Sequence, residues 1–134
     1  MKHIVFDSYA FIALFLGEKG SETVRDLLVQ ISKEELTGSI SVINIGEIFY
    51  MISRKSTAKK ADEAIEAIMQ FPVTIVNADL KLTLEAAGLK ARHKLSYADA
   101  FAAALSISQK ATLVTGDPEF KNLKKEKNFS VQFI

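Results

Sequence analysis

Segments typical of β-strands alternate with segments typical of helices along the whole chain, and this alternation limits the folds it can adopt. Apolar or β-branched stretches predict strands at residues 2–6, 37–41, 73–76, 113–114 and 129–134. Apolar periodicity and capping residues predict helices over 8–16, from 20–21 through 31, 42–54, 57–70, from 77 or 79 to 93, and 97–109. Successive strand–helix–strand units form right-handed crossovers, so the pattern predicts a parallel sheet covered by helices on both faces.

The composition is that of an ordinary globular protein and excludes several kinds of site. The chain has 134 residues, of which 49% are hydrophobic and 25% charged, and it contains no long linker, so residues 1–134 are expected to form a single domain. The absence of cysteine excludes disulfides, zinc–thiolate centres and thiol catalysis. Two histidines are too few for most zinc sites, and a net charge of +1 argues neither for nor against binding of nucleic acid.

The N-terminal segment has a superficial likeness to a signal peptide. Lys2 and His3 precede an apolar run from Tyr9 to Leu16, but Asp7 interrupts the apolar stretch and no cleavage site follows. Eight residues are too few to cross a bilayer, which takes about 20. We expect a buried strand followed by a buried helix, in a cytoplasmic protein that does not enter the membrane.

Four acidic residues stand where predicted elements begin or end. Asp7 follows the first strand, Asp117 follows the strand near residue 114, and Glu47 and Asp99 lie in the first turns of helices. Strand ends and the following helix starts of an open parallel sheet converge on one crevice, where ligands bind. Carboxylates gathered there repel one another unless they are neutralised or share a cation, and oxygen ligands of this kind suit Mg²⁺ or Mn²⁺.

Three of these acids also have a purely local explanation. Asp7 can cap the helix that begins at residue 8, and Asp117 before Pro118 is a usual opening of a type I turn. Asp99 is the third residue after Ser96, where an acid favours the helix dipole and can complete a capping box.

Glu47 and Asp99 are harder to explain locally, because both lie on very apolar helices. The first helix leaves only a narrow polar stripe of Asn44, Glu47 and Arg54, and apolar residues at 100–105 follow Asp99. Charged side chains are rarely buried unless they are paired or bind a metal. These two acids therefore indicate a shared polar site.

Further charged residues follow Asp117. Glu119 is close enough along the chain to reach the same crevice, and a basic cluster comes next, formed by Lys121, Lys124, Lys125 and Lys127. These lysines either remain solvated or hold a phosphate backbone at the rim of the crevice. An acidic pocket bordered by lysines suits a nuclease, and no P-loop, GxGxxG or GxSxG pattern is present.

Four stretches of the sequence, in this order, resemble the PIN domain. They are Val5-Phe6-Asp7-Ser8, the segment 41–47 (SVINIGE), the segment 95–104 (LSYADAFAAA) and the segment 113–120 (LVTGDPEF). The resemblance extends over essentially the whole chain. In detail, the chain resembles VapC, the ribonuclease toxin of VapBC toxin–antitoxin pairs.

The resemblance implies a three-layer α/β/α sandwich with a central parallel sheet and a site that binds Mg²⁺ or Mn²⁺. The metal-binding acids of the family fall on Asp7, Glu47, Asp99 and Asp117, with Glu119 as a further acid. Thr115, near the last of these acids, joins them as a catalytic residue, and Ser8 takes the place of the small hydroxyl residue after the first. One departure is Tyr9, where a small residue is usual and a bulky ring is expected to narrow the cleft.

The activity implied is that of a metal-dependent endoribonuclease that hydrolyses RNA phosphodiester bonds as the toxin partner of an antitoxin. The resemblance also implies a homodimer, and an apolar excess on the early helices supports it: Phe11, Leu14, Phe15, Phe49, Tyr50 and Met51. Two alternatives remain open, a housekeeping PIN nuclease of RNA processing and a non-catalytic module that binds a basic peptide in its acidic cleft. A phosphoryl-transfer enzyme with an aspartyl nucleophile would need a second aspartate where Tyr9 stands.

Overall fold

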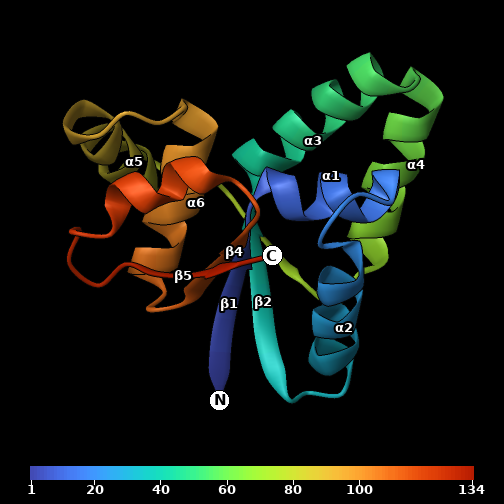
Figure 1. Cartoon of the computed structure of the whole chain (residues 1–134), viewed down its shortest axis with the longest axis horizontal. Coiled ribbons are helices and arrows are strands. Elements are labelled where there is room, and N and C mark those ends of the chain that lie inside the picture. Colours follow the sequence, from blue (N-terminus) through green and yellow to red (C-terminus); the bar gives the residue numbers. More distant parts are fainter.

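Five parallel strands lie side by side at the centre of the structure, a computed structural model that describes residues 1–134 (Figure 1). The strands are β1 (Lys2–Phe6), β2 (Leu36–Ser41), β3 (Thr74–Val76), β4 (Thr112–Thr115) and β5 (Ser130–Phe133). Their order across the sheet is β3-β2-β1-β4-β5, and every neighbouring pair is parallel. The predicted parallel sheet is confirmed.

Helices cover both faces of this sheet, which confirms the three-layer α/β/α arrangement. The helices are α1 (Ser8–Leu16), α2 (Ser21–Ser32), α3 (Val42–Lys55), α4 (Ala58–Gln70), α5 (Leu80–Arg92) and α6 (Tyr97–Ser108). In Figure 1, α1 to α4 lie on one side of the strands, and α5 and α6 lie on the other. None of these helices combines the length and the apolar character that a membrane crossing requires.

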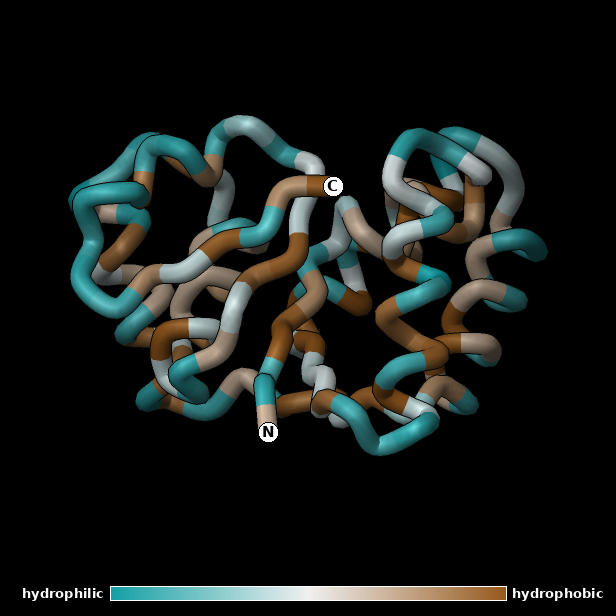
Figure 2. The backbone as a smooth tube through the Cα atoms, turned by 60° about the horizontal axis from the view of Figure 1, so that its bottom comes forward, coloured by the Kyte–Doolittle hydropathy of each residue, from teal (hydrophilic) through white to brown (hydrophobic).

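Alternation along the strands supplies each face with its own hydrophobic core. Ile4 and Phe6 of β1 belong to the core beneath α1 to α4, whereas Val5 belongs to the core beneath α5 and α6. The same alternation separates Val114 from Leu113 in β4. In Figure 2 the strands at the centre contain brown, hydrophobic stretches, whereas the outer loops are mostly teal.

One element was not predicted from the sequence. Residues Pro118–Leu123 form a short 3-10 helix, η1, where the sequence suggested only a turn. Pro118 occupies its first turn, and Phe120 and Leu123 are buried against the α5–α6 side. The cap of α5, which the sequence left open, is Asp79.

The order of the strands creates a crevice between β1 and β4. The chain passes from β1 through β2 to β3 on one side of the sheet, then returns to place β4 and β5 on the other side of β1. The connections after β1 and β4 therefore leave in opposite directions, which opens a ligand crevice at the carboxyl ends of these strands. Asp7 directly follows β1, and Asp117 lies just beyond β4.

Ala102 of α6 is fully buried in the hydrophobic core beneath α5 and α6. We expect Ala102→Leu to lower the free energy of unfolding by about 1–3 kcal/mol through overpacking. Ala91→Leu, the same change at an exposed position of α5, is the matched control and should leave the chemical denaturation midpoint nearly unchanged. Equal midpoints for the two variants would contradict this view of the α6 interface.

Candidate metal centre

An acidic pocket of about 350 Å³ lies at the carboxyl ends of the strands. Its lining comes from α1, α3, α6 and the segment after β4: Ser8, Tyr9, Ile12, Glu47, Met51, Ser96, Asp99, Asp117 and Glu119. Four of these residues are acidic, and none is a lysine or an arginine. The pocket therefore gathers negative charge without a basic side chain in its wall to balance it.

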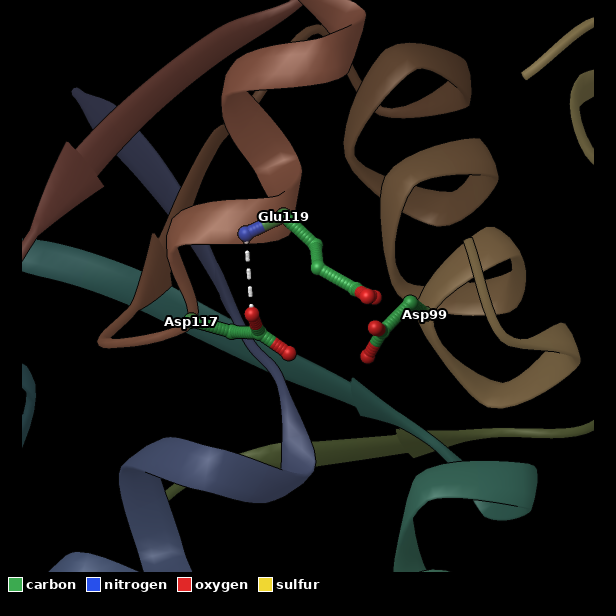
Figure 3. A group of neighbouring side chains, drawn as sticks. All are labelled: Asp99, Asp117 and Glu119. Atoms are coloured by element: carbon green, nitrogen blue, oxygen red, sulfur yellow. Dashed lines mark hydrogen bonds between the residues drawn. The ribbon is translucent and has the colours of Figure 1, made fainter. Parts of the chain in front are cut away.

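Three of the acids come close enough to share one ion. Asp99, Asp117 and Glu119 can each offer one carboxylate oxygen such that all three oxygens lie within 4.8 Å of one another. Figure 3 shows Asp99 reaching in from α6, with Asp117 and Glu119 facing it from the other side. Three carboxylates at this separation are a donor set suited to a hard divalent cation, and the residues present fit Mg²⁺ or Mn²⁺.

Local hydrogen bonds fix the backbone that carries this trio. The Asp99 amide donates to Ser96 Oγ at 3.1 Å, as expected of an N-cap at the start of α6. The Glu119 amide donates to Asp117 Oδ1 at 2.9 Å, which caps η1 in the same way (Figure 3). Capping and clustering are therefore compatible, because a carboxylate that caps with one oxygen keeps the other free.

Asp7 lies apart from the trio, behind the pocket rather than in its wall. Its carboxylate is only 1% exposed and caps α1 by accepting the Ala10 amide at 2.9 Å. Its other oxygen accepts the hydroxyl of Thr115. The structure thus brings Glu47, Asp99, Asp117 and Glu119 to one pocket and places Asp7 beneath it.

Burial and mutual repulsion raise the pKa values of two of these acids into the neutral range. Burial raises the pKa of Asp7 to about 8, and the charges of Asp99 and Asp117 push it further up, against the hydrogen bonds from Thr115 and Ala10. Burial likewise raises the pKa of Asp99 to about 7, with Asp117 and Glu47 as the main charged neighbours. A divalent cation would supply the positive charge that ionises both groups.

Thr115 connects the two sides of the crevice. It is fully buried at the end of β4, and its hydroxyl donates to Asp7 while accepting the Asp117 amide at 2.9 Å. Neither contact involves the open space of the pocket. The geometry makes Thr115 a positioning residue that holds one acid on each side.

Glu47 lines the pocket from α3 but does not belong to the close trio. Its carboxylate accepts the hydroxyl of Tyr50 at 3.2 Å, and the Arg54 guanidinium lies 5.1 Å from the centre of the Tyr50 ring. The negative charge of Glu47 is also the largest cause of the raised pKa of Tyr50. The polar stripe expected on this helix therefore runs from the pocket at Glu47 outward to an exposed arginine.

Asn44, the third member of that stripe, has a role that its sequence position did not indicate. It is fully buried, and its amide nitrogen donates to Ser8 Oγ at 2.9 Å and to the Ala98 carbonyl at 3.2 Å. Ser8 Oγ in turn donates to the backbone carbonyl of Asn44 at 3.3 Å. These contacts join α1, α3 and α6 beside the pocket. The sequence offered only a polar residue three positions before Glu47 on an otherwise apolar helix, which did not show that Asn44 is buried.

Comparison with solved structures finds the same fold in several VapBC proteins. VapBC2 of Rickettsia felis, bound to a DNA fragment from its promoter, matches with a TM-score of 0.76 at 18% identity, covering 98% of each chain. The sarcin–ricin-loop-cleaving toxin VapC20 of Mycobacterium tuberculosis gives 0.75 at 17% identity, over 90% of this chain and 95% of that chain. A DNA-bound VapBC of Salmonella typhimurium gives 0.76 at 14% identity, over 99% of this chain and 98% of the other.

Sequence comparison places the chain in a family. No curated protein sequence matches it significantly. The family model of the PIN domain, however, matches residues 4–126, which is nearly the whole chain. On this match the chain belongs to the PIN domain family.

Proposed function

We propose that this protein is a divalent-metal-dependent endoribonuclease that acts as the toxin of a toxin–antitoxin pair. The observation that carries the proposal is the trio Asp99, Asp117 and Glu119, whose carboxylate oxygens lie within 4.8 Å of one another in a pocket lined by no basic side chain. Membership of the PIN domain family and the likeness to solved VapBC structures support it.

The trio would hold Mg²⁺ or Mn²⁺, with Glu47 and Asp7 as the remaining acids of the site. When bound, a divalent ion lowers the pKa of a coordinated water and offsets the charge that develops on the phosphate. Asp7 acts from beneath the pocket, where Thr115 holds one carboxylate oxygen and the start of α1 holds the other. These contacts fix the orientation of Asp7 before a substrate arrives.

Lysines beyond the trio would hold the RNA chain. Lys121 in η1 and Lys124 and Lys125 just after it are exposed and follow Glu119 along the chain. Contacts of this kind fix the register of a phosphate backbone without reading its sequence. They provide the cationic groups that the pocket wall lacks.

The proposed partners follow from the same surface. A basic segment of an antitoxin would enter the acidic pocket and occupy the space of the metal and substrate, as its charge complementarity allows. We also propose a homodimer of single-domain chains that works in the cytoplasm, with exposed aromatic residues of α3, such as Phe49 and Tyr50, available for contact.

The first prediction concerns the metal and Asp117. Labelled single-stranded RNA should be cleaved with Mg²⁺ or Mn²⁺, and cleavage should stop when EDTA is added. Asp117→Asn should reduce cleavage by about 100-fold or more, because even residues that only support metal ligands contribute about 10–100-fold. Its melting temperature should be equal or higher, because Asn still caps η1 and one repelling charge is gone.

Asp62→Asn, at an exposed position of α4, is the matched control for charge removal and should cleave normally. Unfolding of Asp117→Asn with normal activity in the folded fraction would assign Asp117 a capping role alone. A wild-type protein that binds a basic peptide but never cleaves RNA would instead support the non-catalytic alternative.

The second prediction concerns pH. In the metal-free protein the pKa values of Asp7 and Asp99, about 8 and about 7, lie above their ordinary 3.8. The folded chain therefore keeps protons that the unfolded chain has released, and its free energy of unfolding should fall as pH rises from about 4 to about 8. Mn²⁺ binds the ionised acids, so it should raise the melting temperature more at pH 8 than at pH 5.

Calorimetry of the wild type and Asp7→Asn across this range, with and without Mn²⁺, tests the point. The variant should lose less stability between pH 5 and pH 8. If the metal-free stability of the two proteins changes with pH in the same way, Asp7 has its ordinary pKa in the folded protein.

The third prediction concerns the cut itself. Water that attacks phosphorus in line, opposite the leaving 3′ oxygen, gives a 5′-phosphate and a 3′-hydroxyl and does not use the ribose 2′-hydroxyl. Cleavage should therefore persist when a single 2′-deoxy nucleotide stands on the 5′ side of the scissile phosphate. Mass spectrometry of the products checks both statements. A cyclic phosphate, or the loss of cleavage with that nucleotide, would refute hydrolysis by water.

A further inference from the structure

Tyr9 is the single aromatic residue among those lining the acidic pocket. It lies in the first turn of α1, two positions after Asp7, and 38% of its surface is exposed. Its ring pairs with no other aromatic ring, and its hydroxyl makes none of the hydrogen bonds found in the structure. The pocket thus presents an unpartnered aromatic ring beside four carboxylates.

Contact with Gly116 holds this ring next to the metal-binding segment. A Cβ atom added at Gly116 would lie 2.1 Å from Tyr9 Cε1 and 2.6 Å from Cζ, so only a residue without a side chain leaves room for the ring. Gly116 stands between Thr115 and Asp117, both of which contribute to the candidate metal centre. One face of the Tyr9 ring is therefore packed against the backbone that carries Asp117, and the exposed part of the residue borders the pocket.

The rest of the pocket wall offers a substrate few other apolar surfaces. Apart from Tyr9, the apolar lining residues are Ile12, which is 7% exposed, and Met51, which is half-buried. A phosphate group would be held here through the metal, because no lysine or arginine lines the wall. The flat, apolar part of a nucleotide is its base, and unstacked bases of single-stranded RNA pack on exposed aromatic rings.

We propose that Tyr9 is a stacking platform for the nucleobase next to the phosphate that is cleaved. This inference rests on the proposed ribonuclease function and adds a binding subsite for single-stranded RNA to it. Every base has a π-face, so the platform would hold the substrate in place without selecting its sequence. The lysines after Glu119 would hold the backbone, the trio would hold the scissile phosphate through the metal, and Tyr9 would hold the base.

The test measures cleavage of one single-stranded oligoribonucleotide by the wild type, Tyr9→Ala and Tyr9→Phe, with Mn²⁺ present. Met69→Ala is the control for loss of an exposed apolar side chain, because Met69 of α4 is 63% exposed and does not line the pocket. Stacking that is equal in the ground and transition states should appear in KM alone. We expect KM to rise about fivefold or more in Tyr9→Ala, with kcat staying within about twofold. Both constants should be unchanged in Tyr9→Phe and Met69→Ala.

A modified substrate identifies the base without relying on a variant. The same oligonucleotide carries an abasic nucleotide on the 5′ or the 3′ side of the scissile phosphate. One of the two substrates should raise the KM of the wild type about fivefold or more, and it should have little further effect on Tyr9→Ala. Such coupling requires that the ring and the missing base contact each other.

Several results would overturn the platform. One is an unchanged KM in Tyr9→Ala, and another is a rise in KM with the abasic substrate that is equally large in the wild type and in Tyr9→Ala. A third is a fall in the kcat of Tyr9→Ala together with weaker Mn²⁺ binding, which would mean that Tyr9 supports Asp117. Normal RNA cleavage by Tyr9→Ala with weakened inhibition by a basic peptide would assign the ring to a peptide partner instead.

Failure of the nuclease proposal is distinguishable from failure of the platform. A wild-type protein that cleaves no RNA with Mn²⁺ refutes the nuclease. Quenching of a 2-aminopurine oligoribonucleotide by the wild type, and not by Tyr9→Ala, would still support stacking. Equal fluorescence with both proteins would refute the platform as well.

Discussion

The hydrogen bond from Thr115 to Asp7 joins the two strands between which the crevice opens, and the arrangement of the acids depends on it. Asp7 is almost completely buried, where an ionised carboxylate is costly without compensation. The hydroxyl of Thr115 and the Ala10 amide supply part of that compensation. Because the same hydroxyl accepts the Asp117 amide, the position of the buried acid and the path of the chain after β4 are set together.

The candidate site is built from residues that also perform ordinary local tasks. Asp7 and Asp117 cap the elements that follow them, and Asp99 lies in a helix turn capped by Ser96. The cap at Asp117 uses one carboxylate oxygen and leaves the other for a metal, whereas both oxygens of Asp7 already accept hydrogen bonds. The local explanation of each acid is correct, and yet it does not account for three carboxylates at the mouth of one crevice.

Much of the fold could be predicted because its signals are local. The helix at residues 8–16 and the strand at 2–6 have the predicted bounds, since an apolar run, a cap and Gly17 mark them directly. The helix η1 was missed because it is only six residues long, and its two buried residues, Phe120 and Leu123, are too few to establish a helical period. At the site, the grouping of Glu47 with Asp99 and Asp117 followed from topology. The depth of Asp7 and the burial of Asn44 depend on packing between segments far apart in sequence, which no local pattern records.

Asn44 gives the molecule a mechanical link that the sheet does not provide. The two hydrophobic cores lie on opposite faces of the strands, but beyond the strand ends the Asn44 amide joins α1 and α3 of one layer to α6 of the other. A distortion in either layer is therefore transmitted to the same few atoms beside the acidic pocket. Substitutions deep in either core can alter the site without touching it, so a loss of activity in such a variant does not by itself place the residue near the chemistry.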